Sequence, residues 1–163
     1  MRTLLALLLL AAALPAQAFD VNGVALGATE LAVKKTFPSI HCKPLEWNTD
    51  AASRRCDDGM AALGDVAVNA TFYLKADAVQ AFNLRFDQKD LEKVKQILRA
   101  RWGAPVSEAT EVVAQKDKPD RKIFKMRWEK GADKAVLTSQ LDKKRVDLEA
   151  WRGDFADQIY RVK

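Results

Sequence analysis

The residues that could do chemistry lie close together, between positions 41 and 58 of the 163-residue chain. His41 is the only histidine, which excludes a zinc site of several imidazoles and gives no support for a nucleophile–histidine pair. Asp57 and Asp58 stand before Gly59, but two adjacent acids lack the spaced oxygen ligands of a calcium loop, and we interpret them as a turn. The sequence predicts no catalytic residue, no metal site and no cofactor.

The first 18 residues have the pattern of a secretory signal peptide. Arg2 supplies the positive start, residues 4–14 form an apolar run that is short for a membrane span, and a small-x-small cleavage pattern ends at Ala18. We therefore expect cleavage after Ala18 and a periplasmic or secreted location for residues 19–163. No cysteine stands at the cleavage point to carry a lipid, so we expect at most peripheral membrane contact.

Both cysteines, Cys42 and Cys56, belong to the exported part. An even number of cysteines in an oxidising compartment predicts one disulfide. In the chain-entropy model, such a loop of about 15 residues gives roughly 3 kcal/mol of stability. The wide spacing of the two cysteines excludes a CxxC redox motif.

The charge of the chain is uneven along its length. Residues 19–87 hold 7 basic and 9 acidic side chains, whereas residues 88–163 hold 19 and 13, so the halves carry −2 and +6. An electrostatic partner is expected to meet the second half first. Basic and acidic residues are interleaved, and an exported protein rarely meets nucleic acid, so we expect no nucleic-acid partner.

Two helices are predicted to position the rest of the chain. The first occupies residues 29–37, with Thr29 as its N-cap and an inward stripe that includes Leu31 and Val33. The second occupies residues 87–102 and presents Leu91, Val94, Ile97, Leu98 and Trp102 on one face.

Strands are predicted where apolar residues alternate with polar ones. We expect loops at residues 39–59, tied by the disulfide, and at residues 106–121, whereas residues 155–162 fit either a helix or a strand. The predicted strands are a short one at 19–24 and longer ones at 65–74, 79–86, 122–129, 134–141 and 145–151.

Antiparallel strands beside segregated helices predict an α+β domain, with an antiparallel sheet of about five to six strands and two helices packed on one face. Residues 19–163 are expected to form a single domain. Two fused helix-plus-sheet modules in tandem, residues 19–87 and 88–163, are the alternative.

A short stretch resembles a known family of exported modules. Residues 26–29, Leu-Gly-Ala-Thr, with Val33 and Phe37-Pro38 behind them, resemble the G-x-T-x-x-x-V helix start of the SmpA/OmlA type. Trp102-Gly103-Ala104-Pro105 is similar to the helix exit of such modules. Their tandem form is the fold of the β-lactamase inhibitor protein, so the resemblance implies an envelope protein that binds other proteins.

We therefore expect an exported, soluble protein-binding module of the bacterial envelope, an inhibitor or an assembly accessory, whose partner is another envelope protein. A hydrolase of cell-wall or small-molecule substrates, with Asp57 or Asp58 as its base, and a basic module for anionic envelope polymers are the alternatives. The expected binding surface is the open face of the sheet with the loop of Trp47. Its residues are Trp47, Asn69, Thr71, Tyr73, Asn83, Arg85 and Arg127.

Overall fold

The structure of the protein is a computed structural model that describes residues 18–162. All but the last residue of the expected signal peptide lies outside the described residues. Phe19, the residue expected to follow the cleavage site, is fully buried and contacts the ring of Trp102 at 4.9 Å between centroids.

The first half of the chain forms one short helix and six strands. Thr29 caps helix α1 as expected, because its hydroxyl oxygen accepts a hydrogen bond from the Ala32 amide at 3.2 Å. The elements are β1 (Asp20–Val21), β2 (Val24–Ala25), α1 (Glu30–Thr36), β3 (His41–Pro44), β4 (Arg54–Leu63), β5 (Val66–Lys75) and β6 (Ala78–Asp87).

The second half repeats the order of a helix followed by four strands. Gly103 ends helix α2 with a φ of 85°, a left-handed conformation that favours glycine. The elements are η1 (Gln88–Asp90), α2 (Leu91–Trp102), β7 (Ser107–Val113), β8 (Arg121–Lys130), β9 (Asp133–Gln140), β10 (Arg145–Arg152) and α3 (Phe155–Gln158).

Eight of the strands form one antiparallel sheet in the order β3-β4-β5-β6-β10-β9-β8-β7, and β1 and β2 form a separate two-stranded sheet. The halves of the chain meet where β6 pairs with β10 in the middle of the large sheet. Both halves thus share one sheet, and a division into two modules stays a prediction.

The predicted fold class is wrong. The described chain is predominantly β, with an eight-stranded sheet in place of the expected five to six strands. The two segments expected to be loops, residues 39–59 and 106–121, contain strands β3, β7 and the start of β4. Strands β3 and β7 are the edges of the sheet, and β7 is exposed at every position, so neither has the apolar alternation that marks a half-buried strand.

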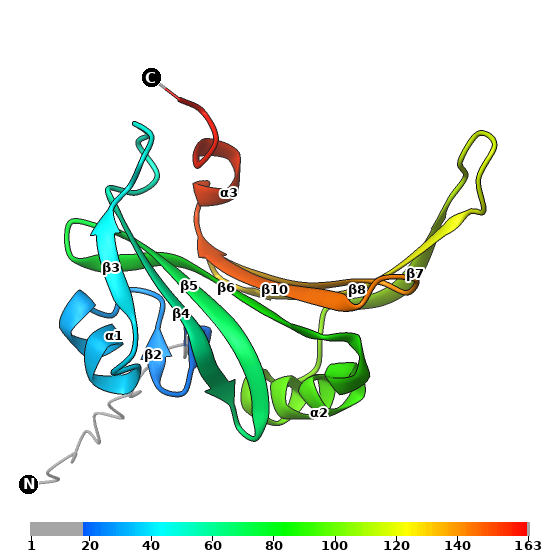
Figure 1. Ribbon diagram of the computed structural model, residues 1–163, viewed down its shortest axis with the longest axis horizontal. Coiled ribbons are helices and arrows are strands. Elements are labelled where there is room, and N and C mark those ends of the chain that lie inside the picture. The colour runs from blue at the N-terminus through cyan, green and yellow to red at the C-terminus, as the bar shows by residue number, and fades with distance from the viewer. Residues whose placement is uncertain (1–17, 163) are drawn as a thin grey trace, which may run out of the picture.

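One face of the sheet is covered by both helices and by β1 and β2 (Figure 1). Val33 of α1 and Leu98 of α2 pack there against strand residues such as Phe72. Leu31, expected on the inward stripe of α1, is 76% exposed, because this seven-residue helix turns only Val33 toward the core. We call this side of the sheet the helix face.

The opposite face, which we call the open face, is concave. It lies between α3 at one end and the long β7–β8 hairpin at the other (Figure 1). A small cluster covers only the α3 end, where Ala51, Ala52 and Ala81 pack with Phe155 and Ile159. The remainder of the open face carries no helix.

The predicted disulfide is confirmed. Cys42 and Cys56 are bonded, and they are direct cross-strand partners on β3 and β4. The segment between these strands reaches over to α3, where the Trp47 indole N–H donates to the Ile159 carbonyl and the Thr49 hydroxyl donates to that of Gln158, both at 2.7 Å.

No described helix combines the length and apolarity that crossing a bilayer requires.

Candidate functional site

The candidate site is built by the pleat of the central strands. Successive side chains of a strand point to opposite faces, so the residues adjacent in sequence to buried Phe72 and Leu84 line the open face. One row of cross-strand partners therefore crosses this face from β3 to β8. Its members are His41, Asp57, Thr71, Asn83, Glu149, Val136 and Arg127.

A hollow of about 260 Å³ lies over the centre of this row. We call it the α3 pocket, because Phe155, Ile159 and Tyr160 of the C-terminal segment form part of its wall, together with Trp151 of β10. Its floor is mostly polar and comes from four strands. The polar residues are Arg55, Asn69, Thr71, Tyr73, Asn83, Arg85 and Glu149.

Five of the seven residues expected in the binding surface line the α3 pocket: Asn69, Thr71, Tyr73, Asn83 and Arg85. Trp47 supports the wall from behind, since its ring stacks on that of Tyr160 with 6.3 Å between centroids. Arg127 belongs to the same face but not to the pocket. It lies two strands beyond Glu149, with Val136 between them, and its guanidinium is 3.9 Å from the Glu111 carboxylate.

Both arginines of the floor form ion pairs with neighbouring carboxylates. Arg55 binds Asp57 at 2.8 Å, and the Thr71 hydroxyl donates to the same carboxylate at 2.8 Å. Arg85 binds Asp147 across the β6–β10 pair, also at 2.8 Å. The floor therefore offers mostly compensated charges and hydrogen-bonding groups to a ligand.

Two titratable groups of the pocket have raised pKa values. Desolvation raises the pKa of the Tyr73 phenol. Desolvation by the walls also raises the pKa of Glu149, and nearby Asp147 adds to the effect. The Asn83 amide, which donates to Glu149 at 3.2 Å, and the positive charge of Arg85 only partly oppose this rise. Although its side chain reaches solvent, Glu149 is the perturbed acid of the pocket.

The acids considered as catalytic bases have other contacts. Asp58 is buried on the helix face, where it accepts hydrogen bonds from the Ser39 hydroxyl at 2.7 Å and from the Met60 amide at 2.8 Å. The Met60 bond stabilises an irregularity of β4, whose register shifts between Asp58 and Ala61. Asp57 is held by Arg55 and Thr71 on the open face. The two carboxylates thus lie on opposite faces of the sheet, and only Asp57 is on the open face.

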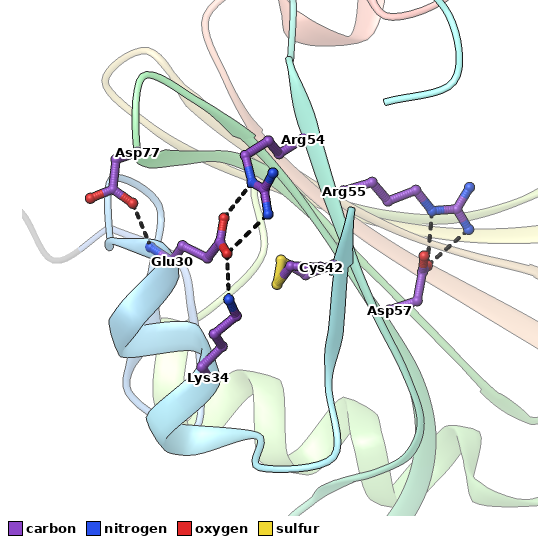
Figure 2. The surroundings of a disulfide bond; sticks show 8 residues. Glu30, Lys34, Cys42, Arg54, Arg55, Asp57 and Asp77 are labelled. Carbon is purple, nitrogen blue, oxygen red and sulfur yellow. Dashed lines mark hydrogen bonds and ion pairs between the residues drawn. A yellow bond between two sulfur atoms is a disulfide. The ribbon is translucent and has the colours of Figure 1, made fainter. Parts of the chain in front are cut away.

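A cluster with metal-ligand chemistry occurs beside the disulfide. The ligand atoms of Glu30, Cys42 and Cys56 lie within 4.8 Å of one another. Both sulfurs are used in the disulfide, however, and the Glu30 carboxylate accepts from Arg54 and Lys34, each at 2.6 Å. Figure 2 shows these contacts, and it shows Arg54 and Arg55 pointing to opposite sides of β4. The cluster is a structural ion-pair site as long as the disulfide is intact.

Sequence reasoning missed the pocket residues that come from the C-terminal part, above all Glu149, Trp151 and Tyr160. A signal for two of them was present, because Glu149 and Trp151 alternate with the buried Leu148 and Ala150 along β10. No sequence signal indicates the pairing of β10 with β6, which joins residues 58 to 70 positions apart.

Comparisons with known proteins do not assign the chain to a family. No protein-family model and no curated protein matches it. Among solved structures, it is similar to a DUF4309 family protein (YjgB) from Bacillus subtilis subsp. subtilis str. 168, with 10% sequence identity and a TM-score of 0.43 over 84% of this chain and 88% of that chain. A similarity of this degree carries no information on function.

Proposed function

We propose that this protein is an exported binding module of the bacterial envelope that recognises another protein through the open face of its sheet. The observation that supports this function best is the unequal covering of the two faces. Helices α1 and α2 and strands β1–β2 cover the helix face, whereas the concave open face carries only α3 and the Trp47 segment at one end. The centres of protein–protein interfaces commonly combine aromatic anchors with hydrogen-bonding groups, and the open face carries both.

The chemistry of the α3 pocket favours binding over catalysis. Its ion pairs, Arg55–Asp57 and Arg85–Asp147, neutralise both arginines of the floor, and its aromatic wall offers apolar surface to a ligand. Tyr160 is 77% exposed and Trp151 is half-buried, so both rings have surface left for a partner to cover.

The disulfide supports the proposed export, because structural disulfides persist in oxidising compartments such as the periplasm. The proposed export also rests on the signal peptide predicted for residues 1–18. The proposed binding role also rests on the resemblance of the first helix to SmpA/OmlA-type modules. Its partner is proposed to be a protein of the same compartment.

Photo-crosslinking from single positions tests the proposed function. A benzophenone amino acid is placed at Thr71 or Asn83 in the α3 pocket. The control position is Lys35, an exposed residue of α1 on the helix-face side of the protein. We expect one and the same protein, identified by mass spectrometry, to be crosslinked from both pocket positions and not from Lys35.

Adducts of equal yield from all three positions would show that the open face has no special role. Irradiation that yields no adduct from either pocket position would also contradict the proposal. Electrophoretic mobility without reductant monitors formation of the Cys42–Cys56 disulfide in each variant and thereby serves as the folding control.

A further inference from the structure

The α3 pocket is one end of a longer furrow on the open face. Two further and more open hollows, of about 450 and 400 Å³, adjoin it, and Arg85 lines all three. The furrow runs along β6 and β10. Its floor follows Trp151, Glu149, Asp147 and Arg145, which are alternate residues of β10.

The chemistry of the furrow changes from one end to the other. At the α3 end the wall is aromatic and apolar, with Trp151, Phe155 and Tyr160. The centre offers the Asn83 and Glu149 side chains and the Arg85–Asp147 ion pair. At the far end the β9–β10 turn places three cations together.

The far end carries three cations that form no ion pair with the described residues, although Asp87 lies across from Arg145 on the neighbouring strand. Lys143, Lys144 and Arg145 line the second hollow, and all three are exposed. Among the described residues, no carboxylate lies within ion-pair distance of these three cations, whereas Arg85 is paired with Asp147. We call these three residues the basic corner.

The length of the furrow matches an extended polypeptide. From Trp151 to Arg145 the strand advances six residues, which is about 20 Å. In an extended peptide every second side chain points the same way, so residues 1, 3, 5 and 7 of a heptapeptide have the spacing of the four β10 side chains on the floor. A chain lying along the furrow can therefore address each of its chemical zones with one side chain.

From this geometry we infer that the furrow binds an extended acidic segment of the partner protein, with an aromatic side chain in the α3 pocket and carboxylates at the basic corner. The inference rests on the proposed function and adds the chemistry of the partner segment. Charge complementarity specifies the acidic end, and the aromatic wall of the pocket specifies the other end. Binding should fade as salt rises, because the charges of the basic corner are exposed to solvent and are screened.

Synthetic heptapeptides provide the test with the full folded protein. The probe is fluorescein-labelled Trp-Thr-Thr-Thr-Thr-Asp-Glu, made in both chain directions, and binding is followed by fluorescence anisotropy. We expect at least one direction to bind, and to bind at least tenfold more weakly when both acids are replaced by lysine or when tryptophan is replaced by serine.

Charge reversal at the basic corner locates the acidic end. Lys144→Glu combined with Arg145→Glu should weaken binding of the probe at least tenfold. The matched control is Lys116→Glu combined with Lys118→Glu in the β7–β8 connection, which makes the same change in net charge at exposed positions far along the sheet. This control should change the affinity less than twofold.

A second measurement locates the aromatic end. With benzophenone in place of the tryptophan, the probe should crosslink within residues 155–160 or to Trp151. Crosslinks on α1 or α2 would overturn the inference, as would equal binding of the acidic and lysine peptides. A third overturning result is binding that dextran sulfate abolishes and that does not depend on the tryptophan, since it would indicate an anionic-polymer surface.

The outcome separates this inference from the proposed function. If neither direction of the probe binds while Thr71 and Asn83 still crosslink to one envelope protein, the acidic-segment inference fails and the protein-binding function stands. If the probe binds as expected and the pocket positions capture no protein, the furrow is a peptide site and the envelope-partner proposal fails.

Discussion

The helix face and the open face are formed by the same strands, yet adjacent residues of one strand make opposite kinds of contact. On β5, Phe72 is fully buried between the rings of Phe37 and Phe82, whereas Thr71 beside it is half-buried and donates to Asp57. The helix face is an apolar core closed by two helices, and the open face is a polar surface that the protein leaves accessible. The buried core and the accessible polar surface are thus separated by a single step along the strand.

Two glutamates show the same difference in electrostatic terms. Glu30, beside the disulfide, accepts from both Arg54 and Lys34, and these contacts lower its pKa from 4.5 to about 2. Glu149 on the open face has its pKa raised, because desolvation outweighs its bond from Asn83. The protein compensates the charge of the first carboxylate and leaves the second poorly compensated.

The largest expected loss of stability comes from a substitution in the core on the helix face. Its control is the adjacent residue of the same strand, which lies on the open face. Phe72→Ala should lower the free energy of unfolding by about 3–5 kcal/mol, since it leaves a cavity in the core. Thr71→Val keeps the shape of the side chain and removes one hydrogen bond, so it should cost about 1 kcal/mol or less. Urea unfolding of both variants measures the difference, and equal costs would contradict the separation of the two faces.

The disulfide ties edge strand β3 to β4 and should give the next largest effect. Reduction of Cys42–Cys56 should lower the free energy of unfolding by about 3 kcal/mol, because the reduced unfolded chain regains the freedom of the closed loop. Urea unfolding with and without reductant measures this. A Cys42→Ala, Cys56→Ala double variant, which should be insensitive to reductant, is the control. An unchanged midpoint on reduction of the native protein would show that the bond adds no stability.

The parts of the fold that follow from local apolar alternation were predictable from sequence, and the edge strands were not. β5 buries alternate residues over its whole length and β6 does so from Phe82 to Phe86, so the alternation predicts this hairpin. β7 buries none of its residues, and it is a strand only because its main chain pairs with β8 from Ser107↔Arg127 to Val113↔Arg121. Pairing of this kind leaves no pattern in the side chains of the strand, so β7 was taken for a loop.

The candidate site follows the same rule. Asn69, Thr71, Tyr73, Asn83 and Arg85 were found because they are the outward residues of one local hairpin. The other half of the pocket depends on β10 lying next to β6 and on the C-terminal segment folding back over Tyr73, contacts between residues far apart in the chain. Strand order decides such contacts, and alternation within each strand does not reveal it.

The cluster of Glu30 allows a smaller and pH-dependent test on the helix side of β4. Its folded-state pKa is the depressed one, so its contribution is fully present above pH 4.5 and is lost as the pH falls toward 2. Glu30→Gln should therefore cost about 1 kcal/mol at pH 7, a modest value because the Arg54 and Lys34 side chains are 38% and 49% exposed and solvent screens them. Urea unfolding at pH 7, 4 and 2 should show this difference decreasing toward pH 2, and a difference that stays the same at all three pH values would assign the cost to packing.

The smallest expected effect is a gain in stability, opposite in sign to that at Glu30, on substitution of Glu149 on the open face. A raised folded-state pKa means that the charged form is disfavoured in the folded protein, so the penalty is absent below the ordinary pKa of 4.5 and appears as the pH rises through the folded value. Glu149→Gln, which can still accept a hydrogen bond from Asn83, should raise the melting temperature at pH 7 by roughly 1–2 °C and leave it unchanged at pH 4. Calorimetry at both pH values measures this. A loss of stability at pH 7 would mean that the charge of Glu149 is already compensated in the folded protein, and the contrast between the two glutamates would fail.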